Sequence, residues 1–171
     1  MAKIQRGIPY HEAGHAVACF LLGKEFRSIE IASDGGQVLH YPSRLRQDRS
    51  HGIHRLDQVP RVIEIFLLPS MAGDIAQKKA SPHSVRSGHA QSDRNSQANW
   101  LFNIPAWREY VAYCNARLRI AFDDPITWAG VKGLARALMK RKKLSYLEAR
   151  KAYTDASNKE LQRRRRQKSH N

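Results

Sequence analysis

Three side chains near the start of the chain have the types and spacing of a zinc site. His11, Glu12 and His15 form a His-Glu-x-x-His motif inside residues 8–23, which we interpret as one helix. Histidines four positions apart lie about one turn apart on the same helix face, so both can bind one zinc ion (Zn2+), with Glu12 facing a water molecule at the metal. The motif predicts peptide hydrolysis. Zinc polarises the carbonyl, and Glu12 moves a proton from the attacking water to the leaving nitrogen.

The helix that carries this motif has a start, an end and a packed face. Pro9 suits the first turn, where its missing N–H loses no hydrogen bond, and Gly23 suits the left-handed position after the last turn. Small and apolar residues around the histidines favour a packed helix over a surface helix with two incidental histidines. Cys19 lies one turn beyond His15, and we expect it to pack in the core rather than to touch the metal.

A third zinc ligand must come from outside this helix, because a catalytic zinc has three protein ligands and keeps a fourth position for water. In metzincins a histidine six residues beyond the second ligand supplies it, but that position is Leu21 here. Spacing alone does not choose among the remaining candidates, which are Glu64, Asp74, His83, His89 and Asp93.

Composition indicates one folded domain with a strong positive charge. The 171 residues are 42 % apolar, enough for a core without disulfides, and 30 Lys and Arg against 15 Asp and Glu give a net charge of +15. This charge predicts attraction to nucleic acid, anionic lipid or acidic proteins. Only two cysteines occur, and no apolar run approaches the roughly 18 residues of a membrane span. We therefore expect a soluble protein of the cytoplasm without a transmembrane segment.

A small β-hairpin is predicted directly after the zinc helix. Residues 26–31 and 37–41 have the period-two pattern of strands and flank a turn at residues 34–36. The exposed edge of such a hairpin can accept an extended peptide as a further strand. A hairpin that merely covers the core is the equal alternative. Residues 42–58 are polar and basic and predict a loop.

Apolar stripes in the rest of the chain predict further helices. A kink is expected at Pro69 in the first of them, and Pro105 stops the second, which begins near Asp93. Ser145 and Glu148 form a capping box that opens the last helix. The other predicted helices span residues 59–80, 93–103, 107–122 and 126–142.

Residues 158–171 form a basic tail. The tail contains the run Arg163–Arg166 and one acid, Glu160. It is expected either to extend the last helix or to stay disordered. Such blocks bind nucleic acid or anionic surfaces, whereas a solvated basic end is the alternative that we favour.

The segment Tyr10-His-Glu-Ala-Gly-His-Ala-Val17 resembles the active-site segment of the FtsH-type zinc metallopeptidases, the protease half of the membrane-bound AAA+ protease. The similarity continues through the hairpin and through Met71-Ala72-Gly73 in the next helix. Ala90-Gln91-Ser92-Asp93 resembles the Ala-Glu-Asn-Asp segment of that family, whose Asp is the third zinc ligand. The resemblance therefore implies Asp93 as the third ligand here. His89 stands where the family usually has glycine and is the rival.

The resemblance extends to about residue 153. It implies a mainly α, helical zinc-metallopeptidase domain over residues 1–157, with one small β-hairpin after the zinc helix. The chain departs from the family because it carries neither the membrane segment nor the ATPase module. We therefore do not expect it to unfold substrates, and a separate unfoldase is the partner that this implies. The family peptidase packs as a hexameric ring, and whether this chain forms a homo-oligomer stays open.

The leading prediction is a zinc-dependent endopeptidase that cleaves flexible or unfolded polypeptides, with Glu12 as general base. The retained Glu12 favours this, because a purely structural zinc site needs no general base. The alternative is a non-catalytic, zinc-containing basic module that binds nucleic acid or a partner protease.

Overall fold

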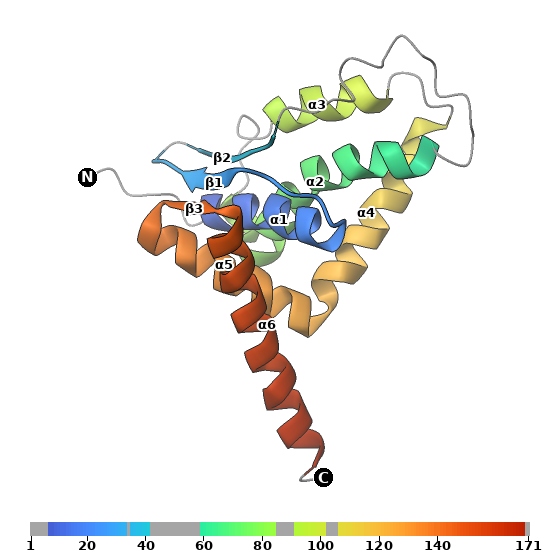
Figure 1. Cartoon of the computed structure of the whole chain (residues 1–171). Helices are drawn as coiled ribbons and strands as arrows, with labels where there is room; N and C mark the ends of the chain where they lie inside the picture. Colours follow the sequence, from blue (N-terminus) through green and yellow to red (C-terminus); the bar gives the residue numbers. More distant parts are fainter. Residues whose placement is uncertain (1–6, 34, 42–58, 85–90, 102–105, 170–171) are drawn as a thin grey trace.

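The computed structural model describes residues 7–33, 35–41, 59–84, 91–101 and 106–169. Within these ranges the chain forms six α-helices, a short 3-10 helix and three strands (Figure 1). In chain order the elements are α1 (Ile8–Leu21), β1 (Ser28–Ile31), β2 (Gly36–Leu39), α2 (Val59–Ala80), η3 (Pro82–Ser84), α3 (Gln91–Leu101), α4 (Trp107–Asp123), α5 (Pro125–Arg141), β3 (Lys143–Ser145) and α6 (Tyr146–Lys168). The prediction of a mainly helical fold is confirmed, and none of the described helices is long and apolar enough to cross a membrane. The predicted loop at residues 42–58 lies outside the described residues.

The sheet is antiparallel with the strand order β2-β1-β3, so β2 lies at its edge. β1 and β2 form the predicted hairpin, with Ile29 opposite Val38. β3 was not predicted. It pairs with the other side of β1 and places Leu144 opposite Ile29. The hairpin is therefore part of a three-stranded sheet, and β3 escaped sequence analysis because three residues between two helices are too few to show a period-two pattern.

α1 is the central helix of the fold. It packs against α2, against α5 and against the strands β1 and β2 (Figure 1). Small side chains permit this close packing, and Ala13, Ala16 and Val17 are completely buried. Cys19 is equally buried among apolar residues, as a free thiol. Neighbours on several sides therefore hold the polar side chains of α1 in fixed positions.

α2 continues as a helix through Pro69. Proline has no N–H to donate to the carbonyl four residues earlier, so the Ile65 oxygen lacks its helical partner. Lys24 Nζ donates a hydrogen bond to this oxygen at 3.3 Å. The proline therefore creates an acceptor on α2 for a side chain that follows α1.

α5 and α6 form a helical hairpin joined through β3 (Figure 1). Asp124 caps α5, since its Oδ2 accepts a hydrogen bond from the Thr127 N–H at 2.7 Å. Ser145 and Glu148 form the predicted capping box at the start of α6. α6 then runs without interruption to Lys168, and its end projects beyond the other helices. Of the two alternatives for the tail, the structure shows the extended helix up to this residue.

Candidate metal centre

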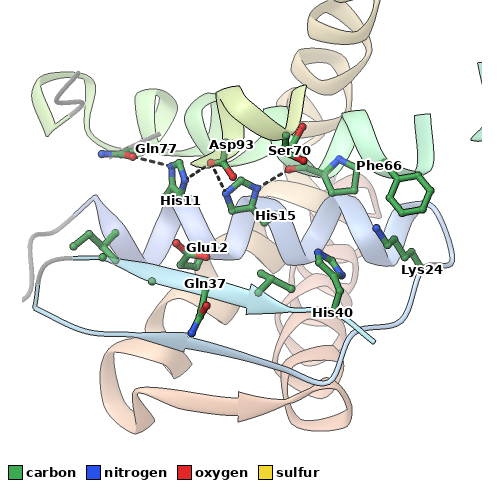
Figure 2. A pocket seen from close by; sticks show the side chains of 16 residues that line it. His11, Glu12, His15, Lys24, Gln37, His40, Phe66, Ser70, Gln77 and Asp93 are labelled. Carbon is green, nitrogen blue, oxygen red and sulfur yellow. Dashed lines mark hydrogen bonds and ion pairs between the residues drawn. The ribbon is translucent and has the colours of Figure 1, made fainter. Parts of the chain in front are cut away.

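The two histidines of α1 and the acid in the first turn of α3 come together in the structure (Figure 2). His11 Nε2 lies 3.1 Å from Asp93 Oδ2, and His15 Nε2 lies 3.2 Å from the same oxygen. The two imidazole rings are nearly perpendicular, with their centres 4.5 Å apart. One carboxylate oxygen therefore faces the Nε2 atoms of both rings. The structure thus brings together the three residues predicted as zinc ligands.

The Nδ1 atom of each ring lies next to a hydrogen-bond acceptor, which places a hydrogen on Nδ1. His15 Nδ1 lies 2.6 Å from the Pro69 carbonyl oxygen, which can only accept a hydrogen bond. His11 Nδ1 lies 3.0 Å from Gln77 Oε1, and the Gln77 amide nitrogen is turned away to donate to the Ser84 carbonyl at 3.0 Å. Both Nδ1 atoms therefore carry hydrogen, and a neutral ring presents the Nε2 lone pair to the shared carboxylate oxygen. Histidines that bind metals are oriented by outer partners in this way.

When both rings are neutral, their Nε2 lone pairs face the lone pairs of the Asp93 oxygen. A positive charge is therefore required between the rings and the carboxylate. A proton can supply it: burial lowers the pKa of His15, but the hydrogen bond and charge of Asp93 outweigh burial and raise that pKa to about 9. Burial raises the pKa of the Asp93 carboxyl. The hydrogen bonds from His11 and His15 act in the opposite direction and outweigh burial, so the pKa lies well below its usual range.

A zinc ion can supply the same positive charge. Two donor atoms that are each about 2.0 Å from a tetrahedral zinc stand roughly 3.3 Å apart. The two observed nitrogen–oxygen separations are 3.1 and 3.2 Å. Two imidazoles and one carboxylate are also a donor set of catalytic zinc sites. The residues present therefore fit a zinc ion in both their chemistry and their spacing.

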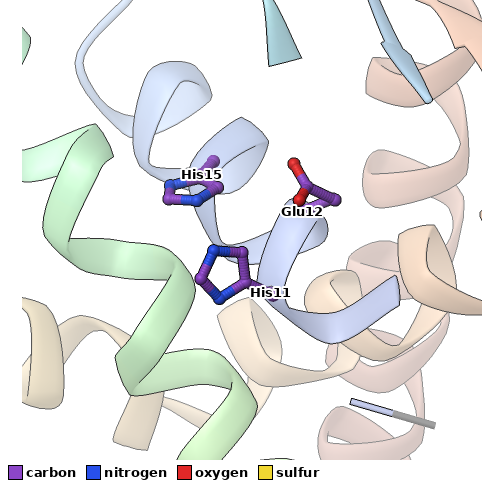
Figure 3. A group of neighbouring side chains, drawn as sticks. All are labelled: His11, Glu12 and His15. Atoms are coloured by element: carbon purple, nitrogen blue, oxygen red, sulfur yellow. The ribbon is translucent and has the colours of Figure 1, made fainter. Parts of the chain in front are cut away.

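Glu12 lies beside the two histidines on α1 (Figure 3). Only 4 % of the residue is exposed, and Oε2 has no partner among the described residues. Burial raises the pKa of the Glu12 carboxyl, although the charges of His15 and His11 act in the opposite direction. A buried carboxylate with an uncommitted oxygen is suited to accept and donate a proton.

Glu12 is itself within reach of a metal, because donor atoms of His11, Glu12 and His15 lie within 4.8 Å of one another. Of the two carboxylates, Asp93 is the better-placed candidate for the third ligand. Its Oδ2 is within hydrogen-bonding distance of both Nε2 atoms, so one oxygen is shared between the two rings. A carboxylate that binds the metal is also less free to transfer protons.

Two glycines leave room for these side chains. A Cβ atom at Gly73 of α2 would lie 2.5 Å from Cε1 of His15 and 2.9 Å from Cε1 of His11. A Cβ atom at Gly36 of β2 would lie 2.5 Å from Cγ of Glu12. Any larger residue would therefore displace the rings or the carboxylate. α2 and β2 approach α1 closely only because these positions carry no side chain.

Two of the other acidic candidates have different surroundings. Asp74 Oδ1 lies 3.5 Å from Nδ1 of His11, on the ring nitrogen that does not face the shared oxygen. Glu64 forms an ion pair with Arg117 at 2.6 Å. Neither residue contributes an oxygen to the point where the two Nε2 atoms converge.

The other side chains to consider are Cys19 and the two histidine candidates. Burial raises the pKa of the Cys19 thiol to about 12, so this side chain stays protonated and is a poor zinc ligand. His83 is exposed on η3. His89 lies outside the described residues, so its role as the alternative third ligand stays a prediction.

A cavity of about 480 Å³ lies over the histidines and Glu12 (Figure 2). This volume is within the range of roughly 300–1,000 Å³ typical of ligand pockets. Residues 35–38, in and next to the edge strand β2, form one wall, and α2 contributes another. The lining residues are Ile8, His11, Glu12, His15, Lys24, Gly35, Gly36, Gln37, Val38, His40, Phe66, Pro69, Ser70, Gln77, Asp93 and Ser96.

Sequence reasoning missed the residues of α2 that orient the histidines. Pro69, Gly73 and Gln77 lie four positions apart and therefore on one face of α2. This is the face that contacts the two rings. The available signal was the spacing of a helix-interior proline, a glycine and a glutamine, in the helix predicted to pack against the zinc motif.

The chain has no match among protein-family models, and no curated protein matches it significantly. What the site does must therefore be inferred from its own residues.

Proposed function

We propose that the protein is a zinc-dependent endopeptidase that cleaves flexible or unfolded polypeptides. The observation that carries this proposal is the convergence of His11 Nε2 and His15 Nε2 on one oxygen of Asp93. Beside them, Glu12 Oε2 is buried without a hydrogen-bond partner in the described part of the chain. A structural zinc site with four protein ligands would not need such a carboxylate. The resemblance of residues 10–17 to the FtsH-type zinc metallopeptidases supports the same reaction.

Zinc in such a site acts as a Lewis acid that polarises the substrate carbonyl and makes water more acidic. The chain's own contribution is proton transfer. Glu12 accepts a proton from the attacking water as the new C–O bond forms, and donates it to the amide nitrogen as the C–N bond breaks. Burial suits Glu12 to both steps, because its raised pKa brings the protonated and ionised forms closer in free energy at neutral pH.

The edge of the sheet supports an extended polypeptide as substrate. β2 pairs only with β1 among the described strands, and residues 35–38 line the cavity beside Glu12. A peptide in extended conformation can add to the other side of β2 through main-chain hydrogen bonds. A folded substrate would have to be delivered by a separate unfoldase. The two free, buried cysteines suit a reducing compartment such as the cytoplasm.

The basic end of α6 favours a second function. Residues 159–168 contain Lys159, the run Arg163–Arg166 and Lys168, against Glu160 as their acid. Such a surface would bind nucleic acid by releasing counterions from phosphates. A salt-dependent shift with mixed DNA and RNA would support this binding function, and no shift at low salt would remove it.

Casein cleavage by the zinc-loaded protein tests the leading proposal. We expect the wild type to hydrolyse casein, and the Glu12→Gln variant to keep its zinc but lose activity by about 10²–10⁴-fold, because the ligands remain and the base is removed. Undiminished cleavage by Glu12→Gln would contradict the assigned mechanism. A zinc-loaded wild type that leaves casein intact would contradict a stand-alone peptidase.

A further inference from the structure

One end of the cavity carries a cationic side chain that has no acidic partner among the described residues. Lys24 and His40 line this end, together with the ring of Phe66 (Figure 2). Lys24 Nζ lies 4.3 Å from the centre of the Phe66 ring and donates to the Ile65 carbonyl oxygen at 3.3 Å. No carboxylate of the described residues forms an ion pair with Lys24. Within the part of the chain that the structure describes, the charge of this ammonium group is therefore not neutralised by an acid.

The end of α1 holds Lys24 in place. Gly23 adopts a left-handed φ of 67°, which favours glycine. Its N–H donates to the Phe20 carbonyl at 3.2 Å, and the Lys24 N–H donates to the Cys19 carbonyl at 2.8 Å. These two bonds form a Schellman motif, a common helix end. The backbone of Lys24 is thus fixed to the same helix that carries the zinc motif.

The surroundings of the ammonium group favour an anionic ligand. A carbonyl oxygen and an aromatic face are both neutral partners, and burial lowers the pKa of Lys24 because its charge is partly removed from water. A carboxylate beside Nζ would form a charge-assisted hydrogen bond, which is stronger than a bond between neutral groups. The His40 side chain lies between Lys24 and His15 in Figure 2 and offers a further polar contact.

We propose that Lys24, His40 and Phe66 form a subsite for a carboxylate of the bound peptide. An Asp or Glu side chain, or the free C-terminus of a peptide, supplies this group. The inference depends on the proposed function for the identity of the ligand as a peptide substrate. At about 1.5 Å per residue, the end of α1 lies roughly 10 Å beyond His15. An extended peptide covers that length in about three residues, so the carboxylate lies two or three positions from the scissile bond.

Peptide binding to the zinc-loaded Glu12→Gln variant tests the subsite without requiring cleavage. Fluorescently labelled, C-terminally amidated peptides carry one Glu or one Gln at successive positions, and a further peptide pairs Gln with a free C-terminal carboxylate. We expect one Glu position, or the free C-terminus, to lower the Kd by about tenfold relative to the neutral peptide at low salt. The preference should shrink in high salt, because salt screens the interaction. The two arms distinguish a side-chain carboxylate from the chain terminus.

Variants of Lys24 identify the group responsible. In the same Glu12→Gln background, Lys24→Met should make the charged and neutral peptides bind equally, and Lys24→Arg should retain the preference. Lys151→Met is the matched control, because Lys151 is an exposed lysine of α6 that pairs with Asp155 at 2.7 Å. The control should retain the preference. Two results would overturn the subsite: equal binding of all peptides to the Glu12→Gln protein with Lys24 intact, or a carboxylate preference that survives Lys24→Met.

Cleavage of the neutral peptide by wild-type protein reports separately on the proposed function. Cleavage combined with equal binding of charged and neutral peptides would overturn the subsite and leave the peptidase. A Lys24-dependent carboxylate preference without cleavage would support the subsite and contradict the peptidase.

Discussion

Two regions of the molecule treat their buried polar groups differently. In the α5–β3–α6 hairpin, the buried Ser157 hydroxyl of α6 donates a hydrogen bond to the Ile126 carbonyl oxygen of α5 at 3.2 Å. In the cavity region, formed by α1, α2, α3 and β2, Glu12 is buried with an oxygen that has no partner in the described part of the chain. Polar groups in a core are normally paired, and exceptions are concentrated at functional sites. The contrast therefore favours the cavity region as the place of the proposed function.

Both regions use glycine to bring helices close together, but for different side chains. A Cβ atom at Gly133 of α5 would overlap the Ala156 side chain of α6, so this contact is small and apolar. A Cβ atom at Gly73 of α2 would overlap the ring of His15. Glycine therefore permits close helix packing in the hairpin, and in the cavity region it leaves room for the histidine rings.

Removal of the shared carboxylate should have the largest effect on the cavity region. We expect Asp93→Ala to lower zinc affinity by more than about 100-fold, beyond the 10–100-fold typical of outer partners of a metal ligand. A zinc titration measures this, with His89→Ala as the comparison. A larger loss in His89→Ala would show that the third ligand is assigned wrongly.

Matched glycine substitutions separate packing from metal binding. Gly73→Ala and Gly133→Ala should each lower the free energy of unfolding by about 1–3 kcal/mol, because each added methyl group overfills a close helix contact. Only Gly73→Ala should also weaken zinc binding. Thermal unfolding with and without zinc measures both effects, since a ligand of the native state raises Tm. An equal loss of zinc affinity in Gly133→Ala would remove the distinction between the regions.

Loss of the amide that orients His11 should lower zinc affinity, but by less than the loss of a metal ligand. Gln77→Leu removes the acceptor of the His11 Nδ1 hydrogen bond. We expect zinc affinity to fall by about 10–100-fold in a competition titration with a chelator. Unchanged affinity would mean that the ring is oriented by packing alone.

The smallest expected effect is in the hairpin. Ser145→Ala removes the side chain that caps α6 and should cost about 1 kcal/mol of stability in chemical denaturation. Zinc affinity should stay at the wild-type value. A drop in zinc affinity in this variant would show that the two regions are coupled.

Local rules explain which features were predictable from sequence. Pro9, the His11–His15 spacing and the Ser145–Glu148 box act within a few residues, and they predicted α1 and the start of α6. The α2 partners of the histidines were missed because their roles appear only when α2 lies against α1. β3 was missed because its pairing with β1 connects segments far apart in the chain.

The third ligand belongs to a different kind of prediction. Spacing left five candidates open, and only the resemblance of residues 90–93 to a known segment selected Asp93. The folded chain brings this residue to His11 and His15 from α3, across α2. A ligand contributed by a distant element has no local pattern that would reveal it.

X-ray absorption at the zinc edge, on protein loaded with one equivalent of zinc, tests the proposed metal centre. We expect one tightly held zinc per chain, with two imidazole nitrogens and oxygen donors at about 2.0 Å. The Asp93→Ala variant should lose an oxygen donor or the metal itself. A zinc shell that contains sulfur, a shell with fewer than two imidazoles, or a protein that retains no zinc would contradict the assignment of His11, His15 and Asp93 as a metal centre.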